Sequence, residues 1–98
     1  MLTRMEVLNS IKEKKELLSN YGVNKIGLFG SFSKNLQHEH SDIDLLVDFN
    51  PDQETFDNLM TIYDILENLF KSHKVEIVTK NGLSKYIGVH ILKETEYV

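Results

Sequence analysis

The chain has 98 residues, of which 41% are hydrophobic and 27% are charged, an ordinary composition for a folded domain. Fifteen acidic residues against eleven basic ones give a formal charge of −4, which argues against a general nucleic-acid binder because such proteins present a basic surface. The sequence contains no cysteine, so disulfides, thiolate metal sites and a cysteine nucleophile are excluded.

No segment of the sequence has the pattern of a targeting or membrane signal. The first residues, Met1 to Glu6, carry an acid early, and Lys12 to Glu16 is nearly all charge. No apolar run approaches the ~18 residues that a membrane span requires. We therefore expect a cytoplasmic protein with no membrane association, folded as one domain over residues 1–98.

The N-terminal part predicts a helix followed by a strand. Thr3 and Glu6 have the spacing of a capping box, so a helix is expected to start there, and Gly22 is its natural terminator. Residues 23–29 then predict a strand that ends at Gly30-Ser31. The apolar stripe of the helix consists of Val7, Leu8, Ile11 and Leu18.

The middle of the chain predicts a second strand and a long helix. Residues 32–41 are polar and are expected to form a loop or a short irregular helical turn. Residues 43–49 predict a strand, which the sequence Asn50-Pro51-Asp52 stops. Apolar residues then recur at helical spacing and define a middle helix: Phe56, Leu59, Ile62, Tyr63, Leu66, Leu69 and Phe70.

The C-terminal part predicts one more strand and one more helix. Residues 75–79 indicate a short strand, and Asn81-Gly82 a turn. From Leu83 onward we expect a final helix, marked by Ile87, Ile91 and Val98. The resulting order, α-β-β-α-β-α, indicates an α/β (α+β) fold in which helices pack on one small mixed β-sheet.

The most informative stretch joins Gly30-Ser31 to Asp42-Ile43-Asp44 through a ten-residue spacer. Alternate residues of a strand share a face, so Asp42 and Asp44 are expected to be neighbours while Ile43 faces the core. Two carboxylates that close repel each other. A divalent cation removes this conflict, and Mg²⁺ prefers oxygen ligands, so the pair predicts a magnesium site.

Glu76 supplies a third acid. It lies between Val75 and Ile77, so it faces away from whatever those two residues bury. If the strand 75–79 lies beside the strand 43–49, all three acids converge on one face. Three carboxylates and a phosphate chain are the ingredients of a two-metal nucleotidyl transfer site. In such a site Glu76 takes the proton of the attacking hydroxyl or helps to hold the nearer metal.

Gly30-Ser31 supplies the other half of the predicted site. Glycine at a strand end lets the backbone turn sharply and approach closely. If a helix starts next, Ser31 and the amides after it can cradle phosphate oxygens, a role compatible with a serine that caps the helix. Lys34 is placed to add a positive charge against a triphosphate.

One part of the chain is similar to the signature of the DNA polymerase β-like nucleotidyltransferase superfamily: Gly30-Ser31 and then Ser41-Asp42-Ile43-Asp44-Leu45-Leu46-Val47. Within it, the short length and Val75-Glu76-Ile77-Val78-Thr79 resemble the minimal nucleotidyltransferases (MNT). The resemblance implies the polymerase β-like nucleotidyltransferase fold. It also implies the antitoxin of a HEPN–MNT toxin–antitoxin pair, which transfers AMP from Mg-ATP to a tyrosine hydroxyl of the HEPN ribonuclease toxin and silences it.

The resemblance also implies roles, with two Mg²⁺ ions as cofactors and ATP as substrate: nucleotide phosphates at Gly30 and Ser31, metals at Asp42 and Asp44, and the third acid at Glu76. The chain departs from the family pattern in one four-residue stretch and at one acid. Phe32-Ser33-Lys34-Asn35 stands where the family often has Arg-Ala-Arg-Gly, so Lys34 keeps a charge but not the bidentate fork of arginine. Glu76 is one methylene longer than the aspartate that is more usual there.

Two other functions stay open. A non-catalytic antitoxin would keep the fold and neutralise its toxin by complex formation alone, which the missing arginines and Glu76 motivate. Nucleotidyl transfer to a small molecule resembles other superfamily members, but those usually carry an extra C-terminal acceptor domain, and this chain stops at Val98. Neither direct nucleic-acid binding nor a membrane partner is expected.

Three neighbouring features have simpler explanations. Asp48 lies two residues further along the acidic face and is expected at the edge of the site or in solvent. His38-Glu39-His40 has alternating residues but no further zinc ligands, so we expect these side chains to be solvated. Phe32 is expected to pack under the loop rather than to stack on adenine.

Overall fold

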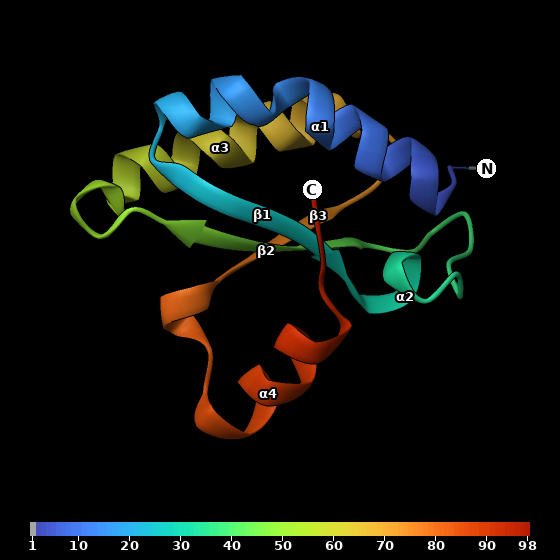
Figure 1. Ribbon diagram of the computed structural model, residues 1–98. Coiled ribbons are helices and arrows are strands. Elements are labelled where there is room, and N and C mark those ends of the chain that lie inside the picture. Colours follow the sequence, from blue (N-terminus) through green and yellow to red (C-terminus); the bar gives the residue numbers. More distant parts are fainter. Residues whose placement is uncertain (1) are drawn as a thin grey trace.

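The computed structural model describes residues 2–98 and contains a mixed four-stranded sheet with helices on both faces (Figure 1). The predicted order α-β-β-α-β-α is confirmed, and a one-turn helix, two 3₁₀ turns and a fourth strand are added to it. In chain order the elements are α1 (Arg4–Asn20), β1 (Val23–Phe29), α2 (Gly30–Ser33), β2 (Ile43–Phe49), η1 (Pro51–Gln53), α3 (Phe56–Leu69), β3 (Val75–Thr79), η2 (Lys80–Gly82), α4 (Lys85–Glu94) and β4 (Glu96–Tyr97).

The strands lie in the order β3-β2-β1-β4. The pair β1–β2 is antiparallel and the pair β2–β3 is parallel. A parallel pair needs a long crossover, and α3 provides it. The strand 75–79 thus lies beside the strand 43–49, which is the arrangement needed for the three acids to converge on one face.

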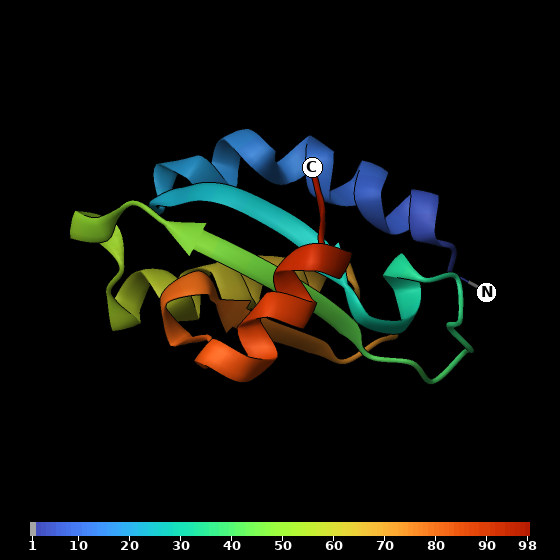
Figure 2. The same ribbon diagram turned by 60° about the horizontal axis from the view of Figure 1, so that its bottom comes forward.

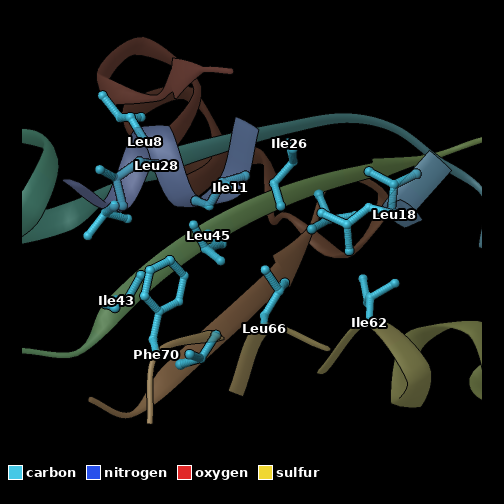
Figure 3. Close-up of a cluster of buried hydrophobic side chains, with 14 of the residues drawn as sticks. Leu8, Ile11, Leu18, Ile26, Leu28, Ile43, Leu45, Ile62, Leu66 and Phe70 are labelled. Atoms are coloured by element: carbon cyan, nitrogen blue, oxygen red, sulfur yellow. The ribbon is translucent and has the colours of Figure 1, made fainter. Parts of the chain in front are cut away.

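Helices α1 and α3 cover one face of the sheet, and α4 lies against the other face (Figures 1 and 2). The main core lies between the sheet and helices α1 and α3, where Leu45 and Leu66 are fully buried (Figure 3). Leu46 alternates onto the α4 face and is fully buried there. The sheet thus has helices on both faces.

The expected helix start and stop are confirmed at α1. Thr3 Oγ1 accepts a hydrogen bond from the Glu6 amide at 3.2 Å, and Glu6 Oε1 accepts one from the Thr3 amide at 3.1 Å. These two bonds form the capping box and satisfy amides that the first helical turn leaves free. Gly22 follows the helix with φ of +92°, a left-handed conformation that glycine adopts without strain.

The end of the chain differs from the prediction. Helix α4 ends at Glu94, and β4 pairs antiparallel with β1 at Gly27 and Leu28. Val98 lies beyond β4, and its amide donates to the Ile26 carbonyl at 2.9 Å, so the assignment of Val98 to the final helix is wrong. The reason is the exposed edge of β1, whose backbone groups need partners that a continuing helix would not supply.

A second difference concerns the side chains of the predicted helix stripes. Ile87 in α4 is 62% exposed and Phe56 at the start of α3 is 74% exposed, so neither belongs to the core.

Among residues 2–98, no helix is both long enough and apolar enough to span a lipid bilayer.

Candidate active site

Three acidic side chains come together on the α4 face of the sheet. Asp44 of β2 stands opposite Glu76 of β3 in the parallel register, so both side chains project to the same face. Asp42 precedes Asp44 by two residues and lies close enough for its charge to act on it. The predicted convergence of these acids on one face agrees with the geometry.

Asp44 is the electrostatic centre of this group. Burial is the main cause that raises the pKa of its carboxyl to about 6, and the negative charges of Asp42, Glu76 and Glu94 contribute to the same rise. A cation bound beside this carboxylate would offset the repulsion from its acidic neighbours. The oxygen donors of Asp44, together with those of Asp42, therefore fit Mg²⁺, which commonly takes one or two carboxylates along with substrate phosphates.

Glu76 lies on the correct face but is engaged by a neighbour. Its Oε1 atom is 2.9 Å from Lys74 Nζ. The hydrogen bond to Glu76 is the first cause of the raised pKa of Lys74, ahead of the charges of Glu76 and Asp42. Within residues 2–98, no three acidic, histidine or cysteine side chains are arranged to hold a metal ion together. The assignment of Glu76 as a third metal ligand stays a prediction.

Gly30 connects β1 directly to α2 with φ of +75°. A Cβ atom at this position would overlap with the Oδ2 atom of Asp44, so the turn and the acid pack without space for a side chain. The close backbone approach expected of Gly30 is therefore present. It brings the turn directly against Asp44.

The short helix after Gly30 corrects one expectation and confirms another. Phe29 is the N-cap of α2 and makes no side-chain cap bond, while Ser31 lies inside the helix, so Ser31 is not a cap. Phe32 is fully buried, and its ring meets the His73 ring edge-on with centroids 5.5 Å apart. The expected packing of Phe32 under the loop is confirmed.

Glu94, at the end of α4, is a site residue that the sequence did not reveal. Its Oε1 atom accepts a hydrogen bond from the Gly30 amide at 3.2 Å, and its Oε2 atom lies 2.9 Å from Lys34 Nζ. The bond with Lys34 is the main cause of a lowered pKa at Glu94, so this carboxylate is charged at neutral pH. An acid that follows a helical pattern gives no signal of a contact 64 residues away.

The remaining candidates lie at the margin. Asp48 is half-buried in the same strand as Asp44. His38 and His40 are exposed in the loop before β2, as expected. The candidate site thus consists of the Asp42, Asp44 and Glu76 carboxylates, the Gly30 turn, and the Lys34–Glu94 pair.

Known proteins share this sequence pattern over nearly the whole chain. The nucleotidyltransferase domain family matches residues 10–98. A candidate protein adenylyltransferase of Methanocaldococcus jannaschii, MJ1215, is 43% identical over 90 residues, which cover 85% of this chain and 100% of the relative. Protein adenylyltransferase MntA of Thermococcus cleftensis is 36% identical over 101 residues, which cover 100% of this chain and 98% of the relative.

Solved structures share the fold. A candidate minimal nucleotidyltransferase superposes with a TM-score of 0.84 at 25% identity, covering 97% of this chain and 95% of that chain. A crystal structure of a toxin–antitoxin with AMP-PNP superposes with a TM-score of 0.70 at 24% identity, covering 91% of this chain and 69% of that chain. The second likeness concerns the fold alone.

Proposed function

Because this chain belongs to the nucleotidyltransferase domain family, we propose that it is a cytoplasmic antitoxin that transfers AMP from Mg-ATP to a tyrosine hydroxyl of a HEPN ribonuclease toxin. The observation that carries the proposal is the group of acids, Asp42, Asp44 and Glu76, on one sheet face beside the Gly30 turn. The name protein adenylyltransferase, carried by its relatives, supports AMP as the transferred group. The shared fold of a toxin–antitoxin structure supports a protein toxin as the partner.

In this proposal the turn after β1 binds the nucleotide. The Ser31 hydroxyl and the Lys34 ammonium bind phosphate oxygens, with Lys34 as a point charge. Asp42 and Asp44 would bind the Mg²⁺ that accompanies ATP. The ion would relieve the repulsion between the two carboxylates. Mg²⁺ held by these two residues would neutralise charge on the phosphates and would favour ionisation of an oxygen nucleophile.

The chemical step is a substitution at the α-phosphorus of ATP. The tyrosine oxygen forms a bond to this phosphorus, the bond to the bridging oxygen of the β-phosphate breaks, and pyrophosphate leaves with the electron pair. The hydroxyl proton passes to a carboxylate, and Glu76 takes it in this assignment. For this the Glu76 Oε1 atom exchanges its contact with Lys74 Nζ for the tyrosine hydroxyl.

A second function is favoured by one specific observation. Lys74 neutralises Glu76, and within residues 2–98 no three side chains of metal-binding type are arranged to share an ion. A non-catalytic antitoxin, which neutralises its toxin by complex formation alone, requires no such arrangement. The two functions differ in what the aspartates do, because only the transferase needs them charged.

The test is to mix the purified chain with the protein encoded by the neighbouring gene, with and without Mg-ATP, and to measure the intact mass of that partner. The transferase is supported by an added AMP on a partner tyrosine, which disappears with the Asp42→Ala, Asp44→Ala double variant. A partner of unchanged mass would overturn it. Suppression of toxicity by the double variant at undiminished strength would support the non-catalytic antitoxin.

A further inference from the structure

The carboxylate of Glu94 joins two groups of the turn that carries the nucleotide phosphates in the proposed function. Its Oε1 atom accepts from the Gly30 amide at 3.2 Å, and its Oε2 atom pairs with Lys34 Nζ at 2.9 Å. We propose that Glu94 is a positioning residue for nucleotidyl transfer, which fixes the Gly30 turn and holds the Lys34 ammonium at the phosphate position. The inference rests on the proposed function and deepens it.

Helix α2 needs such a support because it consists of a single turn. A helix this short leaves its first amides without internal partners and is unstable by itself. Its N-cap, Phe29, makes no side-chain cap bond, and the Glu94 carboxylate supplies an acceptor for the Gly30 amide instead. A third contact is made by the Ser33 hydroxyl, which donates to the main-chain carbonyl of Glu94 at 2.9 Å. The end of α4 therefore holds both ends of α2.

The support is itself fixed to the sheet. Glu94 is followed by Thr95 and then by β4, which pairs with β1 at Gly27 and Leu28. Gly27 has no side chain, and a Cβ atom there would overlap with the Thr95 methyl group, so the segment after Glu94 lies directly on β1. Strand β1 also leads directly into the Gly30 turn. Glu94 and the Gly30 amide are therefore both held by β1, the first through β4 and the second through the chain itself.

The contact with Lys34 prepares a flexible side chain for binding. The Lys34 side chain is 53% exposed, and a free lysine of this kind loses rotamer freedom when it binds a phosphate. The pair with Glu94 restricts this freedom before the nucleotide arrives. The ammonium has three donors, so one directed at Glu94 leaves two for phosphate oxygens. A carboxylate whose pKa is lowered keeps its charge at neutral pH and maintains the pair.

This geometry also gives the residues of the turn different roles. The Gly30 amide is engaged by Glu94, so the direct phosphate contacts fall to Ser31 and Lys34. Gly30 contributes the absence of a side chain next to Asp44 and an amide that anchors the turn. The positioning role predicts that loss of Glu94 weakens nucleotide binding, whereas a carboxylate that merely competed with phosphate would strengthen it when removed.

The experiment compares Glu94→Ala and Glu94→Gln with Glu96→Gln. Glu96 lies two residues away and pairs with Arg4 of α1, so its variant is a matched loss of a carboxylate outside the turn. Binding of Mg-ATP is measured with a fluorescent ATP analogue, and the AMP transfer rate gives KM and kcat. Hydrogen exchange of the Gly30 amide reports the contact itself.

We expect Glu94→Ala to raise both the Kd and the KM for Mg-ATP by about tenfold or more, the loss expected when a charge-assisted contact is misplaced. kcat should change by less than about threefold, because the contact acts on nucleotide binding. Glu94→Gln keeps an acceptor for the Gly30 amide and should lie between Glu94→Ala and the wild type. Protection of that amide should fall in Glu94→Ala only.

A Kd for Glu94→Ala equal to that of Glu96→Gln, or lower than that of the wild type, would overturn the positioning role. If Glu94→Ala does not fold, the same comparison is made with Glu94→Gln, for which a Kd equal to that of Glu96→Gln is the contradicting result. A wild-type protein that binds Mg-ATP but labels no partner would refute the proposed transfer. The Kd comparison would still decide the role of Glu94.

Discussion

The Oδ2 atom of Asp44 fills the space that a side chain at Gly30 would need. Gly30 directly follows Phe29, the last residue of β1, and Phe29 stands opposite Asp44 in the antiparallel register of β1 and β2. The register thus places the Gly30 turn directly against Asp44, the carboxylate whose pKa is raised. For this reason the residue proposed to bind metal, Asp44, and the turn proposed to bind phosphate pack against each other.

Gly30→Ala should therefore unfold at a lower urea concentration than the wild type. A side chain at φ of +75° is strained, and its Cβ atom also overlaps with Asp44, so we expect a loss of about 2 kcal/mol or more in the free energy of unfolding. The control is the double variant with Asp44→Ala, which removes the overlap and keeps the strained φ. The losses should be less than additive, and strict additivity would show that the two residues are not in contact.

Asp44→Asn should change how stability depends on pH in metal-free buffer. The pKa of Asp44, about 6, lies above its ordinary value of 3.8, so between these pH values the folded protein binds more protons than the unfolded one. Asp44 therefore contributes a loss of stability as the pH rises from about 4 to about 6, and this loss persists at neutral pH.

The amide of Asp44→Asn stays neutral and abolishes this contribution. We expect it to stabilise the protein at pH 7 by on the order of 1 kcal/mol, a figure reduced for the solvent screening of a half-buried group. The measurement is the unfolding midpoint at pH 4.5 and pH 7 with a chelator present. If the unfolding midpoint of Asp44→Asn differs between pH 4.5 and pH 7 by as much as that of the wild type, the charge of Asp44 is not opposed by burial and the neighbouring acids.

Glu76→Gln should separate stability from activity. The Glu76 side chain is 44% exposed and pairs with Lys74 at the surface, and such pairs contribute between about 0 and 1 kcal/mol to stability. If Glu76 takes the hydroxyl proton, AMP transfer falls by about 100-fold or more while the unfolding midpoint hardly moves. Lys74→Met, which frees the carboxylate, serves as the control and should retain transfer. Full activity of Glu76→Gln would remove Glu76 from the mechanism.

Phe32→Ala tests the packing of the loop beneath the site. Phe32 is fully buried against His73, so truncation should cost about 3–5 kcal/mol in the free energy of unfolding. Phe56→Ala is the matched control, since Phe56 is 74% exposed and its loss should cost less than about 0.5 kcal/mol. Similar unfolding midpoints for the two variants would contradict the buried position of Phe32.

Local patterns predicted most of the fold because each has its own physical signature. The capping box at Thr3 and the helical spacing up to Phe70 depend only on residues close in sequence. The pairing of β2 with β3 was conditional, because alternation places Glu76 on one face of its strand but does not select the neighbouring strand. That selection comes from the crossover through α3.

The features that could not be predicted depend on long-range contacts. Strand β4 has two residues, too few to show an alternating pattern, and its partner is the free edge of β1. Glu94 reaches the Gly30 amide only because β4 returns the chain to that strand. The ion pair of Lys74 with Glu76 is formed by flexible side chains, which no residue pattern records.

AMP transfer to the partner by Asp42→Asn and Asp44→Asn, with Asp48→Asn as the control, tests the central claim most directly. All three are isosteric losses of one carboxylate from the same stretch of chain, and Asp48 lies beyond the acidic group. With radiolabelled ATP, the initial rate should fall at least about 1000-fold in the first two variants and stay within about threefold in the third. Rapid labelling by Asp42→Asn or Asp44→Asn would contradict the site, as would an equal loss in Asp48→Asn.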